Sequence, residues 1–120
     1  MMDLSAMIQT LKRHPRFDAM GMIASHLGIV RGHSLKGGQV SAIEVVFDPD
    51  VIERIVNETK AMDGIVDVLV EVNPGRLSVG DEVMAVAVGG DTREHVFPAL
   101  EQTVNRIKAE ASRKREIFKE

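Results

Sequence analysis

The chain has 120 residues, 44% of them hydrophobic and 28% charged, with a net charge of −3 and no cysteine. This composition suits one globular domain over residues 1–120 and gives no general attraction to nucleic acid or to acidic membranes. The lack of cysteine excludes a disulfide framework, and no apolar run approaches the roughly 20 residues that span a bilayer, so we expect a cytoplasmic protein.

Hydrophobic periodicity and turn residues divide the chain into three helices and four strands. The first predicted element is a helix with Asp3 or Ser5 as its cap that ends at His14-Pro15, followed by strands at 21–30 and 40–47. Asp48-Pro49-Asp50 starts a second helix through about Met62, and strands at 65–72 and 83–88 and a helix from Arg93 follow. We expect the first two strands to form a hairpin across the glycine-rich loop 31–38, and Gly28 to mark a bulge. The order predicts an α+β fold, with a mainly antiparallel sheet and packed helices.

The junction before the last helix has the most distinctive pattern. The apolar run 83–88 ends in Gly89-Gly90, and Thr92-Arg93 follows at the start of the helix. Free N–H groups and the helix dipole make such a place suitable for an anion, which Arg93 would help to bind. A plain strand-to-helix connection with a solvated arginine explains the same pattern.

The last helix carries a lysine at the edge of its apolar stripe. The predicted stripe contains Phe97, Leu100, Val104, Ile107 and Ala111. Lys108 lies about 20° from Phe97 around the axis, and it is about 22 Å along the helix from Arg93. One small ligand therefore cannot contact both cations in one chain, and a site that uses both needs two copies of the chain.

Other familiar site patterns are absent from the sequence. The four histidines, His14, His26, His33 and His95, have no metal-binding spacing, so no metal site is expected. The glycine-rich nucleotide-binding motifs are also missing, and no cofactor is predicted.

From Gly21 to Glu116, the sequence resembles the large (catalytic) subunit of molybdopterin synthase, a family with an α/β-hammerhead-like fold. The resemblance is carried by 28–31, by 75–82, by the strand that leads into Thr92-Arg93, by Phe97 and Lys108, and by 114–116. It implies a sulfurtransferase that converts cyclic pyranopterin monophosphate to molybdopterin. The sulfur would come from the C-terminal Gly-Gly thiocarboxylate of a small ubiquitin-like subunit, and the large subunit would form a homodimer with one small subunit on each half.

The resemblance also assigns residues to roles. It implies Lys108 and Lys114 as catalytic. The implied substrate-binding residues are Ile29, Val30, Arg31, Thr92, Arg93, Lys108, Lys114, Arg115 and Glu116.

The sequence departs from the family pattern at three places. Thr92 replaces a histidine, His26 replaces a phenylalanine, and the placement of Lys114 requires a one-residue gap, whereas Arg115 keeps the ungapped spacing. Two alternatives therefore stay open: a non-catalytic homodimeric module of the same fold that binds the carrier, and an anion-binding regulatory dimer unrelated to sulfur.

Overall fold

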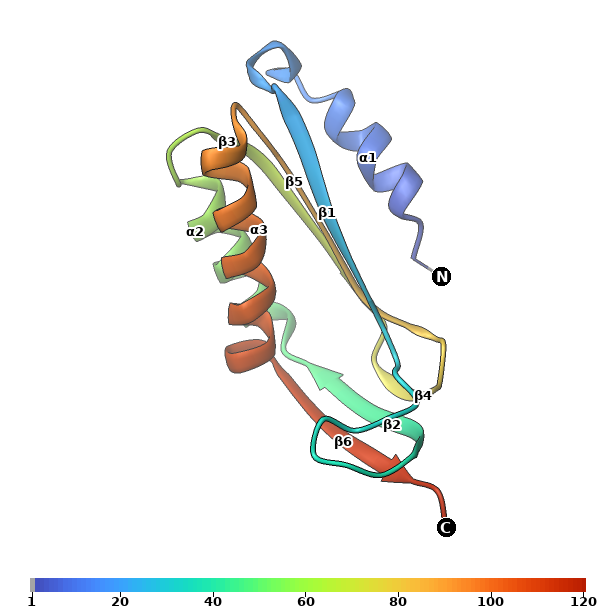
Figure 1. The fold of residues 1–120 in the computed structure, drawn as a ribbon. Coiled ribbons are helices and arrows are strands. Elements are labelled where there is room, and N and C mark those ends of the chain that lie inside the picture. Colours follow the sequence, from blue (N-terminus) through green and yellow to red (C-terminus); the bar gives the residue numbers. More distant parts are fainter. Residues whose placement is uncertain (1) are drawn as a thin grey trace.

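The computed structural model describes residues 2–120 and contains two three-stranded antiparallel sheets with helices packed on one of them (Figure 1). The elements are α1 (Leu4–Lys12), η1 (Phe17–Ala19), β1 (Met22–Ile29), β2 (Val40–Phe47), α2 (Pro49–Lys60), β3 (Ile65–Val72), β4 (Gly75–Ser78), β5 (Glu82–Gly90), α3 (Arg93–Arg106), η2 (Ile107–Ala111) and β6 (Ser112–Phe118). The expected α+β class with antiparallel pairing is confirmed. In this part of the chain no helix is long and apolar enough to cross a membrane.

The first sheet has the strand order β1-β5-β3 and is covered on both faces. Alternation along β5 sends Met84, Val86 and Val88 into the core beneath α2 and α3, while Ala85 and Ala87 pack against α1. Because β5 is buried on both faces, it is a continuous apolar run, as the sequence indicated.

Side-chain caps fix the starts of the first two helices. Asp3 accepts a hydrogen bond from the backbone N–H of Ala6 at 3.0 Å, which confirms one of the two predicted caps. Asp48 accepts from Asp50 and Val51 in the same way, with Pro49 in the first turn of α2.

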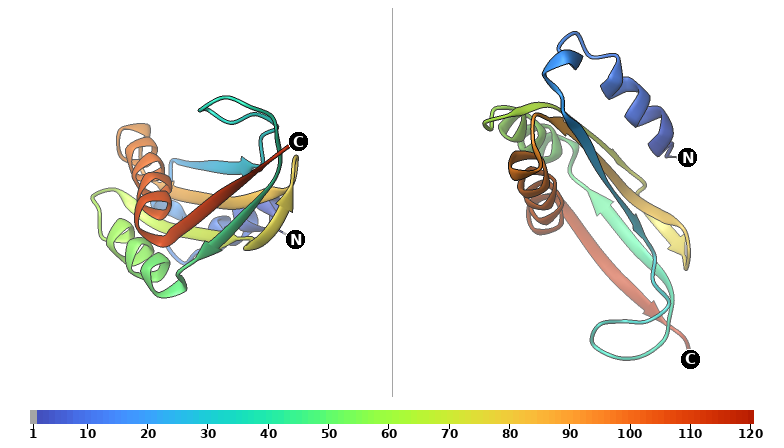
Figure 2. Two further views of the ribbon diagram at one scale, coloured as in Figure 1. Left: turned by 90° about the horizontal axis from the view of Figure 1, so that it is seen from below. Right: turned by 45° about the horizontal axis from the view of Figure 1, so that its top comes forward.

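The second sheet has the order β4-β2-β6 and extends away from the helices, with the C-terminus leaving at its far end (Figure 2). The predicted hairpin of the first two strands is therefore wrong. β1 pairs with β5, and β2 pairs with β4 and β6. The loop between β1 and β2 is closed by an isolated bridge between His33 and Gln39 and by a few backbone hydrogen bonds, not by a ladder between the two strands. The predicted bulge at Gly28 is confirmed, since the β1–β5 register shifts between Gly28 and Ile29.

The C-terminal helix is followed by a strand that the sequence analysis does not predict. Its last turn widens into the π-helical segment η2, and the cluster Arg113-Lys114-Arg115 lies on β6 instead of continuing the helix. The predicted stripe is also wrong at Phe97, which is 54% exposed, because Val96 and Ala99 fill the core there.

Candidate active site

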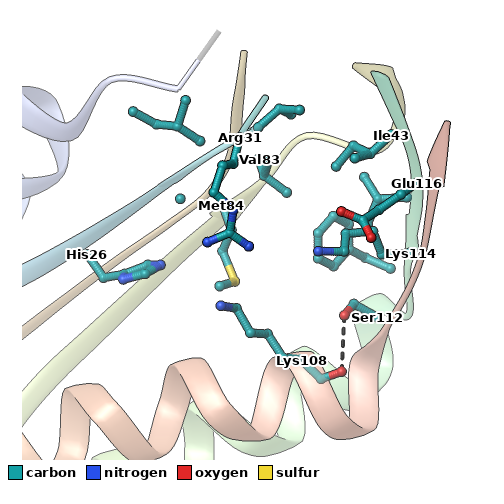
Figure 3. A pocket seen from close by; sticks show the side chains of 14 residues that line it. His26, Arg31, Ile43, Val83, Met84, Lys108, Ser112, Lys114 and Glu116 are labelled. Carbon is teal, nitrogen blue, oxygen red and sulfur yellow. Dashed lines mark hydrogen bonds between the residues drawn. The ribbon is translucent and has the colours of Figure 1, made fainter. Parts of the chain in front are cut away.

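A pocket of about 460 Å³ lies where the two sheets meet (Figure 3). Its residues come from the end of β1 and the residues after it, from β2, β5, η2 and β6. The lining residues are His26, Gly28, Ile29, Val30, Arg31, Ile43, Val45, Phe47, Val83, Met84, Lys108, Ser112, Lys114 and Glu116. The apolar wall belongs partly to a second core of Val30, Val40, Ile43, Val45 and Leu77.

Three cationic side chains point into this space. Figure 3 shows the guanidinium group of Arg31 and the amino groups of Lys108 and Lys114 directed into the pocket. Arg31 follows β1, Lys108 lies on η2 and Lys114 lies on β6. Glu116 is the single carboxylate of the lining, so the pocket is cationic although the whole chain has a net charge of −3. Such a site suits an anionic ligand with a partly apolar body.

Hydrogen bonds position the walls of the pocket. Arg31 Nε donates to the backbone oxygen of His33 at 3.0 Å, and Ser34 Oγ donates to Glu116 Oε1 at 2.8 Å. Ser112 Oγ donates to the backbone oxygen of Lys108 at 3.3 Å, across the junction of η2 and β6. The loop after β1 is thereby tied to β6.

Strand alternation explains which residues of β6 face the pocket. Lys114 and Glu116 lie opposite Val45 and Ile43 of β2, which also line the pocket. Arg115 points to the other face and forms an ion pair with Glu44. Of the two candidates for the second lysine position, Lys114 therefore lines the pocket and Arg115 does not.

Of the predicted site residues, six lie together and three lie elsewhere. The structure brings Ile29, Val30, Arg31, Lys108, Lys114 and Glu116 to one pocket. Thr92, Arg93 and Arg115 are outside its lining, and Arg93 is 77% exposed beside Glu94 at the opposite end of α3 from Lys108.

The glycine pair before α3 does not form an open anion-binding loop. Gly89 and Gly90 are buried within β5, where they pair with β1 on one side and β3 on the other. A Cβ atom on Gly90 would lie 2.5 Å from the backbone oxygen of Gly64 and 2.7 Å from Cγ2 of Val96, so the glycine allows both the turn before β3 and α3 to pack closely on β5. This geometry favours the plain strand-to-helix connection.

His26, which the sequence analysis does not predict as a site residue, lines the pocket with its side chain. Burial lowers its pKa, and the positive charge of Lys108 lowers that pKa further. The sequence signal for its place in the pocket is a polar residue on a strand face that is otherwise apolar. Met22 and Ala24 on the same face of β1 pack against the core beneath α2 and α3. Within residues 2–120, no group of three or more His, Asp or Glu side chains is arranged to hold a metal ion.

Comparisons with known proteins point to one family. Residues 1–110 match the family described as MoaE protein. An uncharacterised protein of Methanocaldococcus jannaschii is 33% identical over 92 residues, which cover 73% of this chain and 77% of that protein.

Two solved structures have the same fold. Molybdopterin cofactor biosynthesis protein E from Burkholderia multivorans is 27% identical with a TM-score of 0.76, over 98% of this chain and 84% of that one. A chain in the complex of subunits 1 and 2 of molybdopterin-converting factor from Helicobacter pylori has a TM-score of 0.72 at 14% identity, over 98% and 80% of the two chains.

Proposed function

The chain belongs to the MoaE protein family, and we propose that it is the catalytic large subunit of a molybdopterin synthase. Family membership supports a role in molybdenum cofactor biosynthesis. The proposed reaction converts cyclic pyranopterin monophosphate to molybdopterin. Its sulfur comes from the C-terminal thiocarboxylate of a small ubiquitin-like subunit, so the absence of cysteine from this chain is no obstacle.

The observation that carries this proposal is the convergence of Arg31, Lys108 and Lys114 on one pocket. Arginine binds phosphate through a planar fork of donors, and Arg31 would hold the cyclic phosphate. Opening of the phosphate ring and loss of oxygen require charge stabilisation and proton transfer, and Lys108 and Lys114 are the groups proposed for both tasks. Ile29, Val30 and Glu116 complete the proposed substrate contacts.

The remaining proposed substrate-binding residues need a second copy of the chain. Thr92 and Arg93 begin α3, whereas Lys108 follows its end, and their separation of about 22 Å exceeds the reach of one small ligand. We propose a homodimer in which Arg93 of one copy serves the pocket of the other, with one small subunit on each half. A complex of subunits 1 and 2 described for the Helicobacter pylori protein is consistent with a small partner.

A second candidate function is a homodimeric module of the same fold that binds the carrier or an anionic ligand without turnover. The departures from the family pattern at His26 and Thr92 favour it.

Reconstitution separates the two candidates. The chain is mixed with a thiocarboxylated carrier and the cyclic precursor, and the dithiolene product is measured. A carrier that ends in an ordinary carboxylate is the control. Product that depends on the thiocarboxylate supports the synthase, whereas carrier binding without product supports the non-catalytic module.

A further inference from the structure

His26 has an unusual position for a histidine on a strand. It lies on the face of β1 that packs toward α3, opposite Val86 of β5 and between Ala24 and Gly28 along its own strand. Its imidazole ring points into the pocket from the side opposite Lys114 and Glu116 (Figure 3).

The ring has an unsatisfied hydrogen-bonding atom. Among the residues that the structure describes, Nε2 of His26 is the one buried side-chain nitrogen or oxygen without a hydrogen-bond partner. Buried polar atoms are nearly always paired, because an unpaired one loses its hydration without compensation. The neighbouring Ala24, Met84 and Val86 offer no side-chain nitrogen or oxygen, and the amine of Lys108, which is near enough to lower the pKa of the ring, forms no hydrogen bond with it. A ligand in the pocket can supply the partner.

The surroundings allow the ring to meet a ligand. A Cβ atom at Gly28 would lie 3.4 Å from Nε2, so the glycine leaves the imidazole room beside the strand. The torsion that rotates an imidazole ring is broad, and a small turn exposes Nε2 to the pocket.

Charge distinguishes His26 from the other polar residues of the pocket. Arg31, Lys108 and Lys114 already provide positive charge, and both burial and Lys108 keep the imidazole neutral by lowering its pKa. A neutral imidazole has one donor and one acceptor nitrogen, which suit the mixed N–H and C=O edge of a heterocycle better than a phosphate.

We propose that His26 is a specificity-determining residue that hydrogen-bonds the uncharged ring portion of the ligand, while Arg31 and the two lysines hold its phosphate. This inference rests on the proposed function, because it takes the pterin as the ring. The side of the pocket that contains His26 would bind the pterin ring, and the side that contains Arg31 and the two lysines would bind the cyclic phosphate.

The test compares two ligands on the full-length chain. The affinity of the cyclic precursor is measured directly, and inorganic phosphate is measured as its competitor. We expect His26→Phe to weaken precursor binding by roughly tenfold and to leave phosphate affinity within about twofold, since only the hydrogen bond is lost. His26→Gln, which restores a donor and an acceptor, should recover precursor binding to within about threefold.

Arg31→Ala is the matched control, and it should weaken both ligands. Wild-type precursor affinity for His26→Phe, or an equal loss of precursor and phosphate, overturns the role of His26 while leaving the proposed function intact. Failure of the wild-type chain to bind the precursor overturns the proposed function itself.

Discussion

Lys108 tests the proposed chemistry at the scale of one residue. Its side chain is exposed to the pocket, while its backbone oxygen accepts the hydrogen bond from Ser112, so truncation of the side chain spares that bond. We predict that Lys108→Ala abolishes sulfur transfer in a single-turnover assay with preformed thiocarboxylated carrier. The free energy of unfolding should change by about 1 kcal/mol or less.

Arg113→Ala is the control for this variant, because Arg113 is an exposed cation of the same C-terminal segment that does not line the pocket. It should retain turnover. Wild-type turnover by a folded Lys108→Ala variant would show that the lysine is not catalytic.

His95 predicts a pH dependence of stability. Its Nδ1 lies 2.7 Å from Oδ1 of Asp91; this hydrogen bond, with the carboxylate charge, raises the pKa of His95 and lowers that of Asp91. The stability that protonated His95 contributes is fully present below its ordinary pKa of 6.5 and is lost as the pH rises through its raised pKa. The stability that ionised Asp91 contributes is present above its ordinary pKa of 3.8 and is lost as the pH falls through its lowered pKa.

We therefore expect His95→Gln to lower the melting temperature more at about pH 5.5 than at about pH 8.5. Both side chains are partly exposed, so high salt should reduce the difference. An equal loss at both pH values would contradict the assignment.

At the scale of elements, the sequence predicts the helices and strands that have a signal within their own residues, such as a cap or an apolar run. α1 begins at one of its two predicted caps, α2 begins at its predicted start, and β5 is recognisable because both of its faces are apolar. β6 was missed because its charged residues follow a helical pattern without a turn signal between them. Its strand conformation depends on pairing with β2, which lies far earlier in the chain, and the ion pair of Arg115 with Glu44 is part of that pairing.

The contact between β5 and α3 gives an element-scale prediction. A Cβ atom on Gly90 would lie 2.5 Å from the backbone oxygen of Gly64 and 2.7 Å from Cγ2 of Val96, so Gly90→Ala forces both the residue before β3 and α3 away from β5. We expect a loss of about 1–3 kcal/mol in the free energy of unfolding, measured by urea denaturation. Gly32→Ala is the control: its nearest neighbour, Cγ1 of Val79, would be 3.6 Å away, and its change should stay within about 0.5 kcal/mol. Equal stability of the two variants would refute this reading of the glycine.

At the scale of the whole molecule, the sequence identified most of the pocket only through resemblance. Arg31, Lys108 and Lys114 are far apart in the sequence and are brought together by the meeting of two sheets, which periodicity cannot reveal. The inward direction of Lys114 depends on the register between β2 and β6. The sequence does not assign His26 to the pocket, because its place there depends on the space left by Gly28 and on an Nε2 atom without a hydrogen-bond partner.

The separation of Arg93 from the pocket leads to a prediction about assembly. If each site combines Lys108 of one copy with Arg93 of the other, the chain must be a dimer at micromolar concentration, and sedimentation should show this.

Lys108→Ala and Arg93→Ala should each be inactive alone, because each variant disables both sites of its own dimer. After the two variants exchange subunits, a mixed dimer contains one site with both native residues and one site with neither. Random exchange makes half of the dimers mixed, so about a quarter of wild-type activity should return. A monomer in sedimentation, or no recovery despite demonstrated exchange, would mean that Arg93 does not serve the partner's pocket.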